Sequence, residues 1–253
     1  MHMPFLPPPK LYTDLAHWWP LLSPIEEYRG EAQRYHELFS RHPRPVRTVL
    51  ELGCGGGNNA FFLKQHYDMT LVDISLQMLA VCAATNPECT LVHGDMRHVR
   101  VERQFDAVFM HDAVCYVTTE EDLKLVAETA ALHCSEGGLV FMAPDFLGES
   151  FREGSSHGGS DDTEGRGIRY LEWTWDPDPD DTMYTVDFAY LLKEADGTVH
   201  SEHDRHVLGV FPELTWCTVL RDAGFSPAVV RLEATGSGCD DREAVYAITG
   251  TRT

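Results

Sequence analysis

A glycine-rich turn directly after an apolar stretch constrains the fold of this chain more than any other feature. The apolar stretch covers residues 46–50, and the turn at residues 51–57 reads Glu-Leu-Gly-Cys-Gly-Gly-Gly. Because glycine has no Cβ, a buried strand that ends in such a turn and opens a helix lets backbone amides approach a ligand closely. The segment therefore predicts a binding loop for a nucleotide-type cofactor, although a plain strand-to-helix turn would have a similar composition.

Short apolar runs alternate with amphipathic segments from residue 46 to about residue 143. This alternation predicts an α/β fold with a parallel sheet and right-handed crossovers. Strands are expected at 46–52, 69–72, 90–92, 107–110 and 139–143, and helices at about 58–66, 76–85 and 119–134. A helix at about 212–223 and strands at 228–232 and 244–249 would complete the main sheet.

Two segments depart from this alternation. Residues 1–45 form an aromatic and proline-bearing arm, with a helical stretch at about 24–39, ahead of a main domain at 46–253. An insertion at about 145–210 begins with residues 148–167, which are rich in Gly, Ser and acidic side chains and predict a flexible loop. Strands are then expected at 168–175, 183–192 and 198–210, the last two joined by the hairpin signal Asp196-Gly197. We therefore expect a small antiparallel β-sheet inserted in the main domain.

The composition narrows the class of partner. Acidic residues outnumber basic ones by 40 to 20, and the formal net charge of −20 repels polyanions. We therefore expect no nucleic-acid partner and a neutral or cationic small molecule as substrate. The 7 cysteines form no Cys-x-x-Cys pair and are typical of a cytoplasmic protein with reduced thiols. We expect no signal peptide and no membrane span, and the sequence leaves the oligomeric state open, a homodimer included.

The residues around the glycine turn distinguish between nucleotide cofactors. A dinucleotide-binding loop needs Gly-x-Gly-x-x-Gly, and here Asn58 stands in place of the third glycine. Asp73 ends the second expected strand, where a carboxylate would accept hydrogen bonds from both ribose hydroxyls. Asp95 and Met96 follow the third strand, where they could contact the amino group and the face of an adenine, and Glu51 suits a ligand ammonium. Together these residues indicate an adenosine that carries an amino acid, although each acid taken singly could be a solvated loop residue.

These segments resemble the class I S-adenosylmethionine-dependent methyltransferases. The resemblance covers about residues 46–143 and is carried by the motifs at 51–57, 71–75, 94–96 and 105–112. It implies a Rossmann-like seven-stranded sheet, mostly parallel with an antiparallel last strand, and S-adenosyl-L-methionine as the cofactor. In that family Glu51 and the glycines would hold the methionine end, Asp73 the ribose and Asp95 the adenine. The expected cofactor-binding residues are Tyr12, Glu51, Gly53, Gly55, Gly57, Asn58, Asp73, Ile74, Asp95, Met96 and His111.

A weaker likeness to the aminosugar N-methyltransferases extends towards the C-terminus. It is carried by His-Asp-Arg-His-Val-Leu-Gly-Val-Phe at 203–211 and Leu-Glu-Ala-Thr-Gly-Ser-Gly at 232–238. Those enzymes also carry an antiparallel insertion after the fifth strand, and an N-terminal segment with a tyrosine covers their cofactor. The likeness implies a lid function for the arm and a cofactor contact for Tyr12. Trp18 and Trp19 would equally suit simple packing on the sheet.

The candidate catalytic residues His111, Asp112 and Tyr116 follow the fourth expected strand. Ligands of an open α/β sheet bind at the carboxyl ends of its strands, so these side chains should face the transferred methyl group. Methyl transfer needs an unprotonated nucleophile in line with the sulfonium, and His111 or Asp112 could take the proton of an amine or hold its ammonium. The alternatives are an edge position for His111, a helix cap for Asp112 and a core position for Tyr116.

Side chains of the insertion bear on the methyl acceptor. Acids beside aromatic rings suit a cationic amine, or simply form a solvated face. These side chains are His157, Asp161, Asp162, Arg169, Glu172, Trp173 and Trp175. The histidines at 200, 203 and 206 match no standard zinc spacing, and we expect no metal.

The sequence thus predicts an S-adenosylmethionine-dependent methyltransferase for a small molecule, with N-methylation of an amine such as an aminosugar ahead of O-methylation of a small carboxylate or hydroxyl substrate. An O-methyltransferase for a carboxylate would need arginines in its pocket, and Arg152, Arg166, Arg169 and Arg205 keep that alternative open. A cofactor-binding protein without catalysis is the third interpretation.

Overall fold

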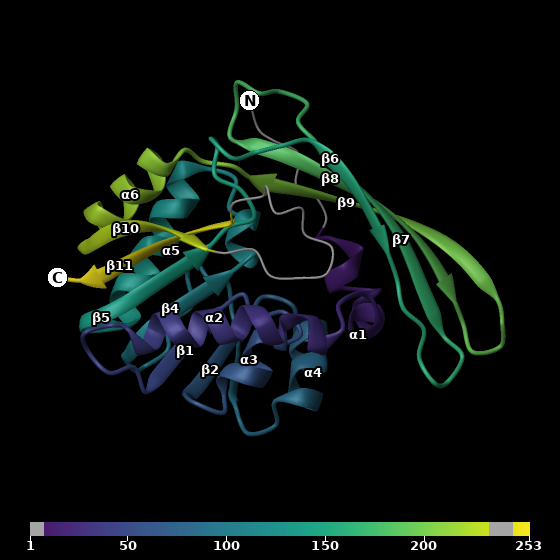
Figure 1. Cartoon of the computed structure of the whole chain (residues 1–253), viewed down its shortest axis with the longest axis horizontal. Coiled ribbons are helices and arrows are strands. Elements are labelled where there is room, and N and C mark those ends of the chain that lie inside the picture. Colours follow the sequence, from purple (N-terminus) through teal and green to yellow (C-terminus); the bar gives the residue numbers. More distant parts are fainter. Residues whose placement is uncertain (1–7, 233–244) are drawn as a thin grey trace.

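A seven-stranded sheet forms the centre of the molecule (Figure 1). The computed structural model describes residues 8–232 and 245–253. The strands are β1 (Thr48–Leu52), β2 (Asp68–Asp73), β3 (Thr90–His93), β4 (Phe105–His111), β5 (Cys134–Ala143), β10 (Phe225–Leu232) and β11 (Val245–Arg252). Their order is β10-β11-β5-β4-β1-β2-β3, and β11 runs antiparallel to both of its neighbours while the other pairs are parallel. This topology confirms the predicted Rossmann-like sheet.

Helices cover both faces of this sheet (Figure 1). One layer contains α2 (Arg29–Ser40), α3 (Asn58–Leu63) and α4 (Leu76–Thr85), and the other contains α5 (Glu120–His133) and α6 (Glu213–Asp222). The side chains of β4 alternate between them, since Ala107 and Phe109 pack on the first layer and Val108 and Met110 on the second. Burial on both faces explains why the central strands are continuous apolar runs in the sequence.

The strands and helices predicted between residues 46 and 143 are all present, with shifted ends. β5 begins at Cys134 rather than at 139, because Gly137 and Gly138 interrupt its apolar pattern. The helical stretch predicted at 24–39 divides into a 3-10 turn, η3 (Ile25–Tyr28), and α2. Residue 244, the predicted start of the last strand, and the resemblance segment at 233–238 lie outside the described residues. Within the described ranges, no helix is long and apolar enough to cross a membrane.

The insertion forms a four-stranded antiparallel sheet that extends away from the main sheet (Figure 1). Its order is β6 (Gly154–Gly158), β7 (Gly167–Trp175), β8 (Met183–Lys193) and β9 (Val199–Gly209). The hairpin at Asp196-Gly197 is confirmed, with Gly197 at φ +88°. The prediction of a loop throughout 148–167 is wrong, because β6 lies within it. Four of the five β6 residues are exposed, so this edge strand depends on backbone pairing with β7 and has no apolar pattern to reveal it.

The N-terminal arm lies between the main and inserted sheets (Figure 1). It contains η1 (Lys10–Tyr12), η2 (Ala16–Trp18) and α1 (Trp19–Leu22). Leu15, Trp18 and Leu21 pack against Ile168 and Tyr190 of the inserted sheet, so Trp18 belongs to a core. The arm therefore has its own apolar anchor on the insertion.

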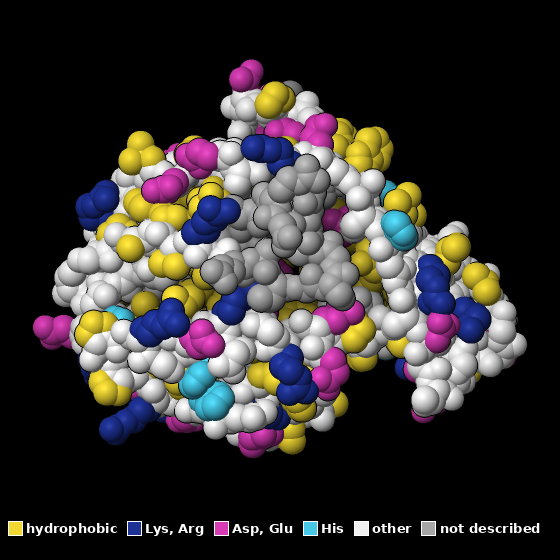
Figure 2. Space-filling model, viewed as in Figure 1, with side chains coloured by type: hydrophobic (Ala, Val, Ile, Leu, Met, Phe, Trp, Pro, Cys, Tyr) yellow, Lys and Arg dark blue, Asp and Glu magenta, His cyan; other side chains and the backbone are white. Residues whose placement is uncertain are grey.

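Among the described residues, the face shown in Figure 2 carries no large basic patch, because its Lys and Arg side chains are scattered among acidic and apolar ones.

Candidate functional site

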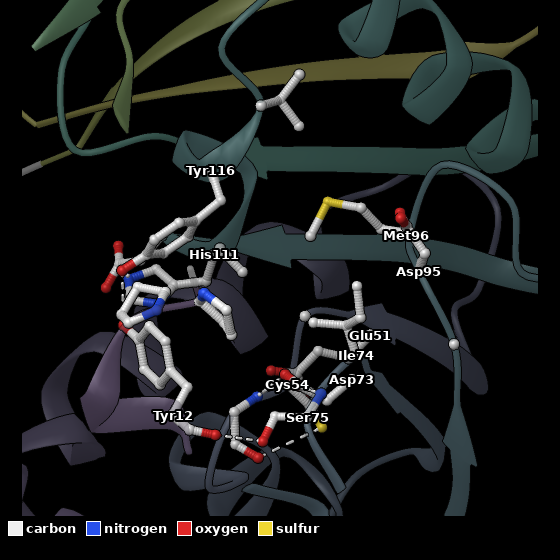
Figure 3. A pocket seen from close by; sticks show the side chains of 18 of the residues that line it. Tyr12, Glu51, Cys54, Asp73, Ile74, Ser75, Asp95, Met96, His111 and Tyr116 are labelled. Carbon is white, nitrogen blue, oxygen red and sulfur yellow. Dashed lines mark hydrogen bonds and ion pairs between the residues drawn. The ribbon is translucent and has the colours of Figure 1, made fainter. Parts of the chain in front are cut away.

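A cavity of about 560 Å³ opens at the carboxyl ends of β1, β2, β3 and β4. Every residue predicted to be catalytic or to bind the cofactor lines it, except Gly57. Figure 3 shows His111, Tyr12 and Tyr116 grouped at one end, Asp95 and Met96 at the other, and Glu51 and Asp73 between them. The fold thus brings together side chains from four successive strand ends and from the N-terminal arm.

Gly53 and Gly57 of the glycine loop both have a positive φ and no room for a Cβ, but they pack against different neighbours. Gly53 has φ +79°, and a Cβ built on it would lie 2.3 Å from the Cβ of Ala113, across the cavity wall. Gly57 has φ +76° and begins α3, and a Cβ there would lie 2.4 Å from Nδ2 of Asn86 and 2.5 Å from Sγ of Cys82. Gly57 therefore packs the loop against α4 and does not face the cavity. Positive φ favours glycine at both positions.

Two buried acceptor oxygens in the cavity wall lack partners. The side chain of Glu51 is 3% exposed, and its Oε2 has no hydrogen-bond partner among the described residues. Asn59 is also 3% exposed, and its Oδ1 likewise has no hydrogen-bond partner among the described residues. Burial raises the pKa of Glu51 to about 8, and the neighbouring Cys82 thiol adds to the effect. Orphaned buried acceptors are costly, so this wall is suited to a ligand that donates several hydrogen bonds and carries positive charge.

Asp73 is held by the backbone of the loops beside it. Its Oδ2 accepts from the Gly55 amide at 2.8 Å, and its Oδ1 accepts from the Ser75 amide at 2.8 Å. Burial raises the pKa of Asp73, and these backbone hydrogen bonds oppose the effect. The exposed side chain of Ile74 adjoins it in the cavity wall. A carboxylate has about four acceptor sites, so Asp73 keeps acceptor capacity for ligand hydroxyls.

The far end of the cavity holds a fixed ion-pair network. Arg97 donates to both carboxylate oxygens of Asp95, with Nη2 at 2.6 Å from Oδ2, and its Nη1 donates to Asp122 at 2.7 Å. Burial opposes ionisation of Asp95, but Arg97 outweighs burial and holds the pKa of Asp95 below its usual value. Met96 lies beside this network in the wall. The arrangement offers a flat polar edge and an apolar face, as an aromatic heterocycle requires.

His111 is clamped between two carboxylates. Its Nε2 lies 2.9 Å from Oδ1 of Asp112 and 3.1 Å from Oε2 of Glu31. Burial lowers the pKa of His111, but Asp112 and Glu31 outweigh burial and hold that pKa well above its usual value. Both carboxylates face the same ring nitrogen, and they favour the charged imidazolium over the neutral ring. His111 is therefore better suited to hold Asp112 and Glu31 than to act as a free base.

Asp112 stands in a strained position at the end of β4. It has φ +42°, and no other non-glycine residue in the described ranges has a positive φ. Burial raises the pKa of Asp112, but the charged His111 outweighs burial and keeps that pKa below its usual value. The side chain is nevertheless 53% exposed, and the residue lines the cavity. Strain of this kind, which costs about 1–3 kcal/mol, persists where surrounding contacts impose it and is common at functional sites.

A second cavity of about 390 Å³ adjoins the first, between the main domain and the inserted sheet. The two share five lining residues: Tyr12, Trp19, Tyr28, Asp112 and Tyr116. The second cavity also exposes Asp145, Glu172 and His206 among aromatic rings. Among the described residues that line it there is no Lys or Arg. Burial, and then the Asp112 carboxylate, raise the pKa of Asp145 well above its usual value.

Side chains of the arm, Tyr12, Trp19 and Tyr28, line both cavities. Trp19 Nε1 donates to Oδ1 of Asn58 at 3.3 Å, and Asn58 Nδ2 donates to the carbonyl oxygen of Ser23 at 2.9 Å. The Ser75 hydroxyl donates to the carbonyl oxygen of Tyr12 (Figure 3). Trp18 and Trp19 therefore differ, since Trp18 is in the core and Trp19 lies in the wall of both cavities.

Most of the insertion side chains singled out in the sequence lie away from the cavities. Asp161 and Asp162 pair with Arg169 and Arg166, and the exposed Trp173 stacks on Trp175. Glu172 does line the second cavity. Sequence reasoning missed several lining or supporting residues: Tyr28 and Glu31 of the arm, Asn59 on α3, Ser75 after β2 and Asp145 after β5. The sequence singles out His206 only as a potential metal ligand, whereas the structure places it in the wall of the second cavity.

The three histidines of β9 do not converge. His203 is exposed and lies 2.8 Å from Oδ1 of Asp187, whereas His206 is 3% exposed on the opposite face of the strand. Within the described ranges, no cluster of three or more His, Cys, Asp or Glu side chains could hold a metal ion.

Comparison with known proteins finds a methyltransferase domain in part of the chain. Residues 49–138 match the methyltransferase domain family. The chain is 31% identical over 131 residues to dTDP-3-amino-3,4,6-trideoxy-alpha-D-glucopyranose N,N-dimethyltransferase of Streptomyces venezuelae. The aligned stretch covers 51% of this chain and 55% of that enzyme. The chain thus spans about half the length of this relative.

Two longer likenesses extend over the inserted sheet. The dTDP-3-amino-3,6-dideoxy-alpha-D-glucopyranose N,N-dimethyltransferase of Streptomyces fradiae is 24% identical over 203 residues, 79% of this chain and 78% of that enzyme. The crystal structure of the sugar N-methyltransferase KedS8 from Streptoalloteichus superposes with a TM-score of 0.79 at 21% identity, covering 100% of this chain and 96% of that one. Residues 49–138 thus match a methyltransferase domain, and the chain shares its fold with solved S-adenosylmethionine-dependent methyltransferases.

Proposed function

We propose that this chain transfers a methyl group from S-adenosylmethionine to the nitrogen of a small amine, with an aminosugar as the favoured class. The observation that carries the proposal is the second cavity, which adjoins the candidate cofactor cavity and is lined by carboxyl groups without a Lys or Arg among its described residues. The polar side chains that a positively charged acceptor would meet there are acidic and aromatic ones, one histidine, Ser23 and Thr174.

The residues of the first cavity fit S-adenosylmethionine group by group. The orphaned oxygens of Glu51 and Asn59 would accept from the ammonium, and Asp73 would accept from the ribose hydroxyls. Asp95 and Met96 would lie at the adenine. When bound, the cofactor supplies a methyl carbon made electrophilic by its positively charged sulfur. The chain itself binds, orients and excludes water, and positioning of this kind can account for much of the rate.

The charges at the junction of the two cavities favour a cationic acceptor. The Asp112 and Asp145 carboxyl groups are hydrogen-bonded to each other, and like charges that close share a proton. An ammonium placed between them would let both ionise. His111 would keep Asp112 in place, and Asp112 would hold the acceptor nitrogen. Tyr116 would then contact both the acceptor and the methyl end.

The shape and the relatives favour a sugar ring. Aromatic side chains such as Tyr170, Tyr184 and Phe188 line the second cavity, whose 390 Å³ suits a ring of that size. The matched relatives are named for N,N-dimethylation of aminosugars, so two successive transfers belong to the proposal. The insertion at about 145–210 would be the substrate cover and the arm at 1–45 the lid. The six cysteines in the described ranges are free thiols, which supports a cytoplasmic location.

The geometry disfavours a carboxylate acceptor. None of the four arginines that kept this alternative open lines the second cavity. Arg166 pairs with Asp162, Arg169 with Asp161 and Arg205 with Asp187, and Arg152 donates to the carbonyl oxygen of Phe151. A bound carboxylate would meet carboxyl groups without a cationic side chain to offset the repulsion.

Two measurements test the proposal in sequence. Calorimetry with S-adenosylmethionine should show binding, and its absence would refute both an enzyme and a cofactor-binding protein without catalysis. Transfer of labelled methyl groups would then be measured to a nucleotide-linked aminosugar, its hydroxyl counterpart and a tricarboxylic acid. Methylation of the aminosugar alone is the expected result. Methylation of the acid alone would reverse the assignment, and binding without transfer to any acceptor would favour the non-catalytic protein.

A further inference from the structure

A buried chain of hydrogen-bonding groups joins the inserted sheet to the two cavities. It begins at Asp204 on β9, whose Oδ2 lies 3.2 Å from Nε2 of His206. Nδ1 of His206 lies 2.6 Å from the hydroxyl oxygen of Tyr116, and that hydroxyl donates to the oxygen of Tyr12 at 3.0 Å. Tyr12 and Tyr116 line both cavities, while His206 lines the second. The chain thus runs from the junction of the cavities to a carboxylate 5% exposed.

Asp204 is fixed as an anion. Its Oδ1 accepts from the Lys10 amide at 3.0 Å and its Oδ2 accepts from the Leu11 amide at 2.8 Å. Burial raises the pKa of Asp204, but His206 and these two amides outweigh burial and hold it below its usual value. The carboxylate therefore balances a positive charge on His206, and it ties the arm to the insertion at the same time.

The geometry allows His206 to exist in two protonation states without moving. When the Tyr116 hydroxyl donates to Tyr12, the contact at Nδ1 requires a hydrogen on that nitrogen, and with a second hydrogen on Nε2 facing Asp204 the ring is charged. When the hydroxyl turns to donate to Nδ1, the ring is neutral. The two states differ by one proton on Nδ1, and reorientation of the Tyr116 hydroxyl lets the hydrogen-bonded chain fit either of them.

The other groups near the junction are poorer proton acceptors. Nε2 of His111 faces Glu31 and Asp112, which hold the pKa of His111 well above its usual value and occupy this nitrogen. Burial raises the pKa of Tyr12 and that of Tyr116, so both phenols keep their protons and pass one on rather than hold a charge. Tyr190 of β8 packs with the arm and lines neither cavity. Asp145, Glu172 and Tyr184 line the second cavity with His206, but none of them belongs to the chain of hydrogen bonds that joins Tyr116 to Asp204.

We propose that Tyr116, His206 and Asp204 form a relay that removes the proton of the acceptor amine, with His206 as the base that holds it. This proposal rests on the N-methylation proposed above. The ammonium gives a proton to the Tyr116 oxygen while the Tyr116 hydroxyl proton moves to Nδ1 of His206, whose positive charge faces Asp204. The freed nitrogen lone pair forms the new N–C bond, and the electron pair of the broken C–S bond stays on sulfur. Loss of the His206 proton to solvent resets the relay.

The activity test compares two histidines of one strand. His206→Asn removes the base, and His203→Asn is the matched control on the exposed face of β9. At about pH 7, kcat should fall at least twentyfold in H206N, and the loss should shrink to less than threefold at about pH 9.5, where the free amine is abundant. H203N should match the wild type, and the Kd of S-adenosylmethionine should change by less than about threefold in both variants. A smaller loss at pH 7, or a loss that persists at pH 9.5, overturns the relay.

A second readout does not depend on activity. In the protein without ligands, nitrogen-detected NMR should show that Tyr116→Phe shifts the Nδ1 resonance of His206, because Nδ1 lies 2.6 Å from the Tyr116 hydroxyl, while the ring resonances of His203 stay unchanged. A His206 Nδ1 resonance that ignores Tyr116→Phe overturns the relay even if the enzyme methylates amines. Failure of the wild type to methylate any amine, with the NMR result as expected, refutes the N-methylation proposal instead.

Discussion

Replacement of Glu51 by glutamine should change how the stability of the ligand-free protein depends on pH. Glutamates of the unfolded chain lose their proton near pH 4.5, whereas burial keeps Glu51 protonated to about pH 8 in the folded protein. The folded state therefore binds the extra proton between these values. The stability associated with Glu51 is fully present below pH 4.5 and is lost as the pH rises through about 8.

The two pKa values set the size of the effect. A gap of about 3.5 pH units, at about 1.36 kcal/mol per unit, gives an upper limit of about 5 kcal/mol above pH 8. Glutamine has nearly the same shape and cannot ionise, so Glu51→Gln should escape this loss. We expect the variant to gain about 2–5 kcal/mol relative to the wild type between about pH 5 and pH 8.5.

Urea unfolding at half-unit pH steps would measure this difference. Glu128→Gln, an exposed position on α5, is the matched control and should show no such trend. If the difference between Glu51→Gln and the wild type changes by less than about 0.5 kcal/mol over this pH range, the reasoning about the orphaned carboxyl is refuted. The same variant should bind S-adenosylmethionine about 30-fold to several hundred-fold more weakly, because the ligand ammonium loses its charged partner.

Three further changes test the other parts of the site. Asp73→Ala should raise the Kd of S-adenosylmethionine at least about tenfold by calorimetry, whereas Asp68→Ala, at the exposed start of β2, should not. Deletion of residues 1–14 removes Tyr12 from the cavity wall but keeps the apolar anchor of Leu15, Trp18 and Leu21. It should also weaken cofactor binding about tenfold, and unchanged affinity in a folded variant would contradict the lid function of the arm. Asp145→Asn and Glu172→Gln, which line the second cavity and not the first, should raise the KM for the amine at least about tenfold while the cofactor Kd stays within about threefold.

The main sheet could be predicted because its strands are buried on both faces. β1 and β4 are apolar runs bounded by loops, and a parallel sheet brings their carboxyl ends to one edge. Glu51, Asp73 and His111 therefore lie in one cavity by topology alone. β6 could not be predicted, because an exposed edge strand is defined by the backbone of its partner rather than by its own side chains.

The acceptor side of the site depends on contacts that no local pattern contains. Tyr116 was predicted from its place after β4, but its hydroxyl meets Tyr12, 104 residues away, and His206, 90 residues away. The period of two along β9 does place His203 and His206 on opposite faces, and the structure agrees: one is exposed and the other is 3% exposed. That alternation says which histidine is buried, but not what it faces. The partner is fixed only when the arm packs on the inserted sheet and Asp204 accepts the Lys10 and Leu11 amides. A relay assembled in this way requires the arm to be closed, so proton removal would be coupled to closure of the cavities over both ligands.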